Sequence, residues 1–202
     1  MVSSTLSKMI KRKILYLLIC LCSSALFGSA QNVALKSNLL TDIAASPNIG
    51  VEVGLVPHWS IEIAGEINDW DINRHKWKHW FVQPEARYWL CDRFAGHFFG
   101  LHAIAGQYNF GNIKNGINFL GSDFSQLSDY RFQGWGAGAG VAYGYDWVLD
   151  KHWNLEAEIG IGWIYTRYDK FSCFDCGRKL ASDMVHNYFG LTKLAFAIEY
   201  IF

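Results

Sequence analysis

The amino-acid sequence predicts an all-β protein: an eight-stranded antiparallel up-and-down transmembrane β-barrel, preceded by a cleaved signal peptide. Three observations favour this fold. After residue 32 the apolar residues alternate with polar ones at a period of two, and no long helical period appears. The alternation gives each strand one strongly apolar face and one charged face. The connections alternate between short turns and longer polar segments, as in outer-membrane barrels.

The first thirty residues have the pattern of a secretory signal peptide. Four basic side chains, from Lys8 to Lys13, precede the apolar run ILYLLICLCSSALFG, and small residues lead to a predicted cleavage site after Ala30. The run is short for a membrane-spanning helix of about 20 residues, which is the alternative. We therefore divide the chain into a signal peptide at 1–30 and an outer-membrane barrel at 31–202.

Composition limits the classes of function. Aromatic residues make up 16% of the chain and charged residues only 18%, against a usual charged share of about 25%. Removing residues 1–30 takes away four positive charges and no negative ones, which turns a net charge of +0 into −4. A chain with this balance lacks the basic footprint of a nucleic-acid-binding protein.

The alternation places eight strands in order along the chain. They are expected at 33–44, 48–56, 59–69, 79–90, 95–109, 134–147, 153–167 and 187–202. Short turns follow near residues 57, 92 and 150, and longer polar loops are expected at 70–78, 110–130 and 169–185. In an up-and-down barrel, all three short turns then lie at the periplasmic end and the long loops at the outer end.

Aromatic residues lie near both ends of the apolar faces, where a membrane barrel carries its two girdles. The residues expected there are Trp59, Trp80, Trp135, Trp147, Trp153, Trp163, Tyr165 and Tyr200. A soluble eight-stranded barrel with a polar exterior, of the lipocalin type, is the alternative. The aromatic terminal residue, Phe202, favours the membrane barrel because it resembles the signal by which barrel-assembly machinery recognises its clients.

The stretch GWGAGAGVAYGYDW (134–147) carries glycine at almost every second position and large apolar groups between them. We expect the glycines to face the barrel interior, where the missing side chains leave space for Arg87, His102, Glu156 or Tyr108. The run does not fit a dinucleotide-binding or phosphate-binding glycine loop.

The polar faces predict a filled polar lumen, because an eight-stranded barrel leaves room for side chains but for no aqueous channel. Charges there must pair or be hydrogen-bonded. The alternative is a proton or ion path, or a carboxylate pair for acid–base chemistry. The residues expected in this network are Lys36, Glu52, Glu62, Glu66, Glu85, Arg87, His102, Glu156, Glu158, Lys193 and Glu199.

Two further segments are candidate sites in the predicted outer loops. The segment RHKWKHW contains Arg74, His75, Lys76, Trp77, Lys78 and His79, a cationic loop suited to lipopolysaccharide phosphates or an anionic glycan. A plain solvated loop is the alternative, and a metal site on a helix bearing His75 and His79 lacks a third ligand. Cys173 and Cys176 are a candidate disulfide, while Cys91 is expected at the opposite end as a free thiol.

Several stretches resemble a known family. WFVQPEARYWL (80–90), FAGHFFGLHAIAGQYN (94–109) and the terminal YIF look like an uncharacterised domain-of-unknown-function family of small outer-membrane β-barrel proteins of Gram-negative gut anaerobes. The segment from Pro84 to Trp89 is the most specific part. The resemblance implies an outer-membrane barrel and carries over no catalytic residue.

These observations predict a non-enzymatic protein of the outer membrane, of a structural or surface-interaction type. No catalytic residue, cofactor or metal is expected. The expected partners are outer-membrane lipid and lipopolysaccharide, the barrel-assembly machinery, and an extracellular protein or glycan. The alternatives are a lipid-modifying enzyme, for which no Ser/His/Asp set is evident, and a narrow transporter of protons, ions or a small solute.

Overall fold

The computed structural model describes residues 32–72, 75–111, 118–119, 122–123, 130–172 and 177–202. Its elements in chain order are β1 (Val33–Asn38), α2 (Leu39–Ile43), β2 (Asn48–Val56), β3 (Trp59–Ile72), β4 (His75–Trp89), β5 (Gly96–Gly111), β6 (Asn118–Phe119), β7 (Ser122–Asp123), β8 (Arg131–Val148), β9 (Trp153–Phe171) and β10 (Lys179–Ile201). Apart from the small β6–β7 hairpin, the strands form one sheet. It closes on itself in the order β1-β10-β9-β8-β5-β4-β3-β2, and every neighbouring pair is antiparallel.

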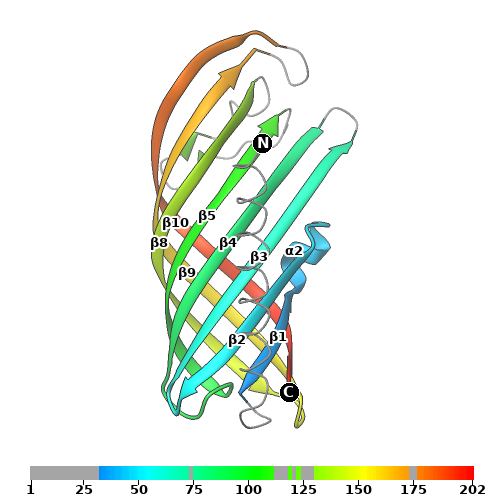
Figure 1. Cartoon of the computed structure of the whole chain (residues 1–202), viewed down its shortest axis with the longest axis vertical. Helices are drawn as coiled ribbons and strands as arrows, with labels where there is room; N and C mark the ends of the chain where they lie inside the picture. Colours follow the sequence, from blue (N-terminus) through cyan, green and yellow to red (C-terminus); the bar gives the residue numbers. More distant parts are fainter. Residues whose placement is uncertain (1–31, 73–74, 112–117, 120–121, 124–129, 173–176) are drawn as a thin grey trace, which may run out of the picture.

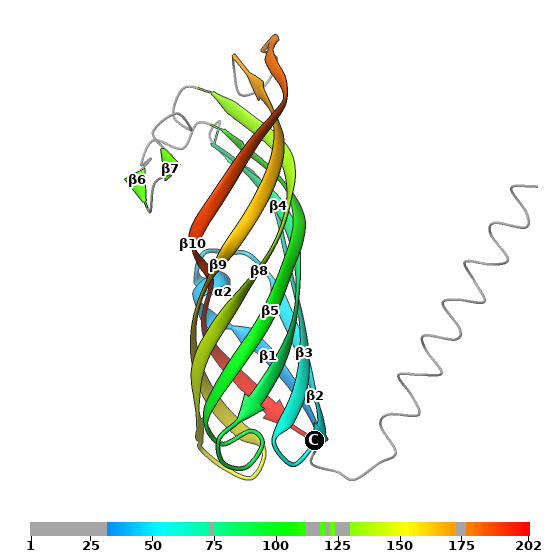
Figure 2. The same ribbon diagram turned by 90° about the vertical axis from the view of Figure 1, so that its left-hand side faces the viewer.

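The eight predicted strands are confirmed as the eight strands of the ring (Figures 1 and 2). Two predicted loops are largely wrong. Most of 70–78 belongs to β3 and β4, and most of the described part of 169–185 belongs to β9 and β10. Cross-strand pairing extends these strands: Trp70 lies opposite Trp77, and Lys179 Nζ donates to Asp169 Oδ2 at 2.6 Å. Polar composition suggested loops, but opposite charges across an antiparallel pair stabilise a ladder.

The first predicted strand, 33–44, is also corrected, because it ends at Asn38 and a short helix follows. The Asn38 side chain accepts a hydrogen bond from the backbone N–H of Leu40, which caps α2. Ala45 then takes a left-handed conformation with φ 55° before Pro47 leads into β2. An asparagine cap and a tight turn thus replace what alternation alone presents as a strand.

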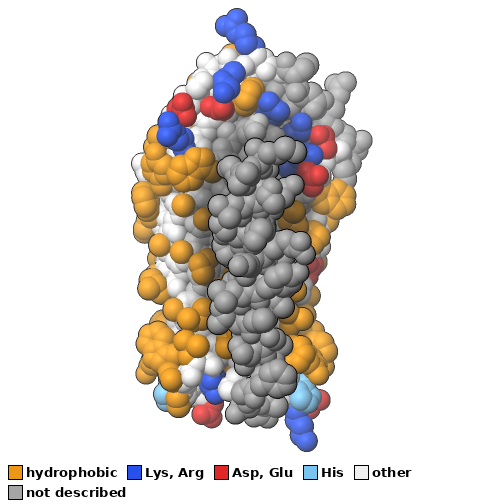
Figure 3. All heavy atoms as spheres, in the orientation of Figure 1, with side chains coloured by type: hydrophobic (Ala, Val, Ile, Leu, Met, Phe, Trp, Pro, Cys, Tyr) orange, Lys and Arg blue, Asp and Glu red, His pale blue; other side chains and the backbone are white. Residues whose placement is uncertain are grey.

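The two faces of the sheet have opposite chemistry. Side chains on the outer face are apolar and exposed, for example Ile61, Leu101 and Val141 at 42%, 64% and 57%. Glu62, which follows Ile61 on the inner face, is only 4% exposed. On the side shown in Figure 3, hydrophobic side chains are visible along both flanks of the molecule, and most of the visible charged side chains lie near its two ends. This confirms the prediction that the apolar side chains of the strands face outward and the charged ones face inward.

The barrel has a closed half and an open half. Near the C terminus (bottom of Figure 1) all eight strands pair around the ring. Toward the other end, here called the far end, β1 and β2 stop at Asn38 and Asn48, while the other six strands continue. Among the described residues, β3 beyond Ile67 then pairs only with β4, and β10 before Lys193 pairs only with β9.

In the described part of the chain, the unpaired edges of β3 and β10 leave the ring open at its side, here called the side opening. The connection between β1 and β2 closes the lower end of this opening. Helix α2 packs on β10, and the turn after it is held to β3. Asn68 Nδ2 donates to Ser46 Oγ at 2.7 Å, and Trp70 Nε1 donates to the Ala45 carbonyl at 2.6 Å. The described helix is too short to cross a membrane.

Candidate functional site

Arg87 lies at the centre of the closed half. From β4 its guanidinium donates to Glu85 on the same strand at 2.7 Å, to Glu52 on β2 at 2.7 Å and to Glu156 on β9 at 2.6 Å. It also donates to Glu158 at 2.8 Å and pairs with Glu62. The side chain is fully buried. One arginine thus joins carboxylates from four strands, which suits its planar group with five N–H donors.

Two lysines, from the neighbouring strands β1 and β10, extend this cluster. Lys36 Nζ lies 2.5 Å from carboxylate oxygens of both Glu52 and Glu156, and 2.9 Å from one of Glu199. Lys193 Nζ lies 2.7 Å from Glu85, 2.9 Å from Glu158 and 3.8 Å from Glu62. Lys36, Glu52, Glu62, Glu85, Arg87, Glu156, Glu158, Lys193 and Glu199 are called the ion network below.

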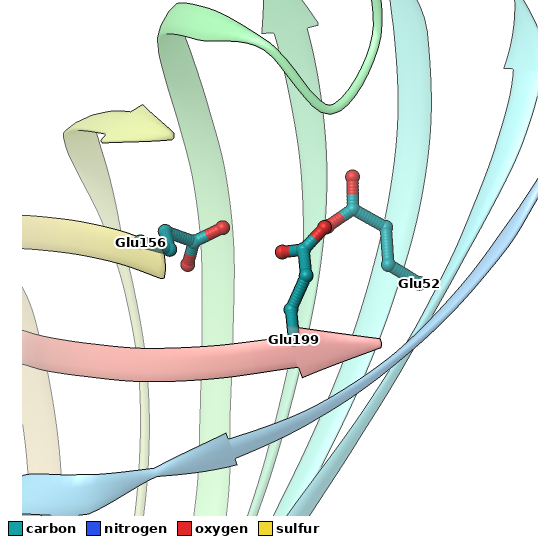
Figure 4. Close-up of side chains that lie close together, drawn as sticks. All are labelled: Glu52, Glu156 and Glu199. Atoms are coloured by element: carbon teal, nitrogen blue, oxygen red, sulfur yellow. The ribbon is translucent and has the colours of Figure 1, made fainter. Parts of the chain in front are cut away.

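Within the described part of the chain, two sets of three glutamates have carboxylate oxygens close enough together to hold a metal ion. We call these two sets the carboxylate triads. Figure 4 shows the first, in which Glu52, Glu156 and Glu199 extend from β2, β9 and β10 toward one another. The distances above place the Lys36 ammonium in this triad and the Lys193 ammonium in the second, formed by Glu62, Glu85 and Glu158. Each triad therefore already holds a cation from the chain itself.

The ion network contains six carboxylates and three cations, so it carries more acidic than basic groups. Several of its oxygens accept no hydrogen bond from the described residues, among them both oxygens of Glu199 and Oε1 of Glu158. Burying unpaired charge is costly. Protons shared among the carboxylates would balance the excess without any metal.

The other predicted lumen residues lie beside the network. His102 Nε2 is 2.8 Å from Thr192 Oγ1, and its Nδ1 is 3.7 Å from Glu85. Glu66 is separate from the network, because its Oε1 is 2.9 Å from His79 Nε2 farther up the barrel. The sequence predicted Glu66 as part of the network because the alternation of residues along a strand predicts the inner face. Alternation does not predict the position of a residue along the barrel axis.

Several inward polar residues were missed. Ser60 donates to Glu52 and accepts from Trp89 Nε1 at 2.8 Å. Asn154 donates to Asp146 Oδ2 at 2.9 Å. The four that lie outside the predicted set, Ser60, Trp89, Asp146 and Asn154, occupy the inner positions of their strands, so strict alternation was the signal that could have identified them. Trp89 and Phe98 are fully buried in the interior at the end beside the C terminus, here called the near end. Aromatic rings therefore fill this part of the interior together with the polar groups.

The glycine stripe of β8 makes room for inward side chains, as predicted for His102. A Cβ at Gly140 would lie 2.7 Å from His102 Nε2, and one at Gly144 would lie 2.2 Å from the Phe98 ring. At Gly138 the neighbour is backbone, since a Cβ would lie 2.3 Å from the Trp163 carbonyl oxygen. The stripe therefore also permits a close approach of β8 to β9.

The RHKWKHW segment is a strand in the structure, which corrects the predicted loop and the helical pairing of its histidines. Arg74 lies outside the described residues, and His75 begins β4. Lys78 Nζ lies 2.7 Å from Asp69 Oδ1, and this hydrogen bond raises the pKa of Lys78. Lys76 Nζ lies 3.5 Å from Asp71. Carboxylates from β3 thus compensate both lysines, and the segment offers less positive charge to a phosphate than its sequence suggested.

Of the three cysteines considered above, the structure describes only Cys91. Cys173 and Cys176 lie outside the described residues. Cys91 is exposed and forms no disulfide within the described part of the chain.

A cavity of about 860 Å³ occupies the far half of the barrel, within the six longer strands. It follows one row of paired residues around the sheet: Asn68, His79, Tyr108, Gly134 and Tyr168. No member of the ion network lines it. We call this cavity the chamber; the ion network fills the interior beyond it.

The fold and the interior define a class: a closed eight-stranded antiparallel sheet with an apolar exterior and a charged, filled interior. The chain belongs to the DUF3575 family, described as proteins of unknown function, whose model matches residues 16–202. This confirms the resemblance to a domain-of-unknown-function family. No curated protein matches the sequence.

Proposed function

We propose that this protein is an outer-membrane β-barrel, exported with residues 1–30 as its signal peptide, that serves as a non-enzymatic surface-interaction protein. Its lumen is plugged by the ion network, and its chamber opens to the cell exterior. The observation that carries the proposal is the inverted polarity of the barrel: aliphatic and aromatic groups cover the outside, while Arg87 and its carboxylates are buried inside.

The height of the apolar surface supports a membrane location. Trp135 and Trp147 lie on the outer face of β8, near its two ends, and both are more than 40% exposed. At about 3.3 Å per residue and a tilt of about 40°, they are roughly 30 Å apart along the barrel axis. Aromatic girdles flank an apolar band of about 25 Å in outer-membrane barrels, so this spacing fits.

The lengths of the connections support an orientation of the barrel in the membrane, with the near end toward the periplasm. The β2–β3 and β8–β9 turns at the near end are short, while the far end carries the longest strands and the β6–β7 hairpin. Short turns face the periplasm in barrels of this type. In this orientation the chamber faces the outside, where it can meet lipopolysaccharide, a glycan or an extracellular protein.

Cell fractionation tests the location. We expect the full-length protein in the outer-membrane fraction, resistant to carbonate extraction, and migrating differently on gels when boiled. Recovery in the soluble periplasmic fraction would overturn the proposal.

Planar-bilayer recording tests the plugged lumen. We expect the refolded protein to give no stepwise conductance, because fully buried, ion-paired side chains fill the closed half. Reproducible conductance steps would support a transporter instead. Lipid A mass spectra that change on gene deletion would support the lipid-modifying enzyme.

A further inference from the structure

We infer that the chamber is a binding site for an uncharged sugar ring. The proposed function enters only in the source of the sugar, because binding itself is a property of the purified chain. The chamber has the size of a ligand pocket, since its 860 Å³ lies within the usual range of about 300–1,000 Å³.

The chamber is closed at the end that faces the ion network. Toward the near end, Gln83 Nε2 donates to the Thr192 carbonyl across the interior, and His102 meets the Thr192 hydroxyl at 2.8 Å. The ion network fills the barrel beyond this layer. A ligand entering from the far end therefore stops in the chamber and does not cross the barrel.

A second route into the chamber lies in the side of the barrel. No residue of β1, β2 or α2 lines the chamber, and β3 and β10 do not pair with each other within the described residues. The Ala45–Ser46 turn contacts β3 at Asn68 and Trp70, so the route lies beyond this turn. Ile67 and Phe189, at 60% and 66% exposed, extend outward from these two strands. A molecule anchored in the membrane can thus present its headgroup through the side opening.

Charge excludes an ionic ligand. The inward row of the chamber carries no carboxylate, lysine or arginine: it consists of Asn68, His79, Tyr108, Gly134 and Tyr168. The charged residues at the chamber wall lie at alternating positions and form three opposite-charge pairs, at 2.7 Å, 3.0 Å and 2.6 Å: Asp69 with Lys78, Asp183 with Arg167, and Asp169 with Lys179. The Lys179 hydrogen bond lowers the pKa of Asp169, which keeps this carboxylate ionised. No unpaired charge is left among these groups to compensate the desolvation of an anion or a cation.

The chamber nevertheless offers polar groups that need a partner. His79 is 7% exposed, and its Nδ1 has no hydrogen-bond partner among the described residues. Its Nε2 is already engaged with Glu66. A buried polar atom without a partner costs about 1–3 kcal/mol, so a ligand hydroxyl at this position would be favoured over an apolar group.

An aromatic surface lies beside this histidine. The ring of Tyr108 stacks on Phe110 at 5.3 Å, and Phe110 stacks on Trp77 at 4.6 Å. These three rings are called the aromatic ledge: Tyr108 lines the chamber, and Phe110 and Trp77 lie next to it, with ring centroids 5.9 Å and 6.1 Å from that of His79. A sugar ring suits both features, because its C–H face packs on an aromatic face while its hydroxyls donate and accept hydrogen bonds.

Saturation-transfer NMR tests the inference on full-length protein refolded in a zwitterionic detergent that carries no sugar headgroup. The soluble probes are maltotriose and the trimer of N-acetylglucosamine, with glucose 6-phosphate as the charged comparison. We expect magnetisation transfer to the ring protons of at least one neutral probe. Glucose 6-phosphate is expected to bind at least tenfold more weakly than that probe.

Variants locate the site. Tyr108→Ala and His79→Ala should each weaken binding at least tenfold, whereas Tyr143→Ala, on the outer face of β8, should leave it unchanged. Trp77→Leu provides a second change to the aromatic ledge at a side chain that is 41% exposed, where loss of folding is less of a concern. Altered migration on heating verifies that each variant folds.

A further experiment with the sugar anchored in a bilayer distinguishes the two sources, a soluble sugar and a membrane-anchored one. Dodecyl maltoside in phosphatidylcholine nanodiscs presents maltose, the disaccharide with the same linkage as maltotriose, from the bilayer. Binding of the free trisaccharide supports a soluble ligand, and binding only of the anchored sugar supports entry through the side opening. The inference is overturned if neither form binds, if the chamber variants bind like wild type, or if the phosphorylated sugar binds best. Fractionation tests the proposed function independently.

Discussion

At the residue scale, Arg87 holds the interior together. Its guanidinium donates hydrogen bonds to both carboxylate triads, through Glu156 in one and Glu158 in the other. Lys36 lies within the first triad, with Glu62 of the second 4.0 Å away, and Lys193 lies within the second. Breaking a buried ion pair by removing one partner costs far more than breaking a surface pair, because the remaining charge stays buried.

We therefore predict that Arg87→Met destabilises the protein by at least about 3–5 kcal/mol, the cost of one broken buried pair. Arg167→Met is the matched control, because Arg167 forms an exposed pair with Asp183 that contributes about 0–1 kcal/mol. Urea unfolding in lipid vesicles measures both. Equal losses in the two variants would mean that the network contributes no more than a surface ion pair.

The acidic excess makes a second prediction at this scale. Glu199 contacts one cation, Lys36, whereas Glu156 contacts both Lys36 and Arg87. Glu199→Gln removes surplus negative charge and should change the free energy of unfolding by less than about 1 kcal/mol, while Glu156→Gln should cost at least about 2 kcal/mol.

Infrared spectroscopy checks the protons directly. We expect a carboxylic-acid C=O stretching band in the wild-type protein at neutral pH, and a weaker band in Glu199→Gln. A wild-type spectrum with carboxylate bands alone would contradict proton sharing in the network.

At the element scale, the spacing between β8 and β9 depends on glycine. A Cβ at Gly138 would lie 2.3 Å from the Trp163 carbonyl oxygen and 2.8 Å from the Cα of Ile164. Both atoms belong to backbone, which cannot move aside as a flexible side chain can. Gly65 on β3 is different, because the nearest atom to an added Cβ is 3.9 Å away.

Gly138→Leu should therefore block folding, or destabilise the barrel by at least about 1–3 kcal/mol through overpacking. Gly65→Leu introduces the same side chain and should fold normally. Heat-modifiable migration on a gel distinguishes the two. Normal migration of Gly138→Leu would show that β8 can move away from β9 without loss of the fold.

Strand alternation correctly predicted which residues share a face, because side-chain direction in a strand depends only on local geometry. It failed at strand ends. The Asn38 cap and the positive φ of Ala45 ended β1 early, and the pairing of Asp69 with Lys78 extended β3 and β4 into a predicted loop. These outcomes depend on partners that lie elsewhere in the chain.

At the scale of the whole molecule, the barrel divides into a sealed half and an open half. The sealed half owes its closure to β1 and β2, and the chamber lies in the half that these two strands do not reach. Strand length therefore divides the interior: side chains fill it where eight strands pair, and a cavity lies where six continue.

This division makes a prediction about the turn after α2. Trp70 Nε1 and Asn68 Nδ2 both donate to the Ala45–Ser46 turn, which bounds the side opening. Trp70→Phe removes one hydrogen bond and should speed hydrogen exchange at 39–46 while leaving the ion network intact. Mass-spectrometric exchange measures both regions; protection unchanged at the turn would show that Trp70 does not hold it.

The sequence by itself determined the strand order, the two faces and all nine members of the ion network, because the alternation of apolar and polar residues depends only on neighbouring positions. Tertiary structure alone decided which carboxylates share Arg87, that Glu66 pairs with His79 instead, and where the ring opens. The physical reason is that strand phase fixes direction, whereas height and contact depend on the register between strands that are far apart in the chain.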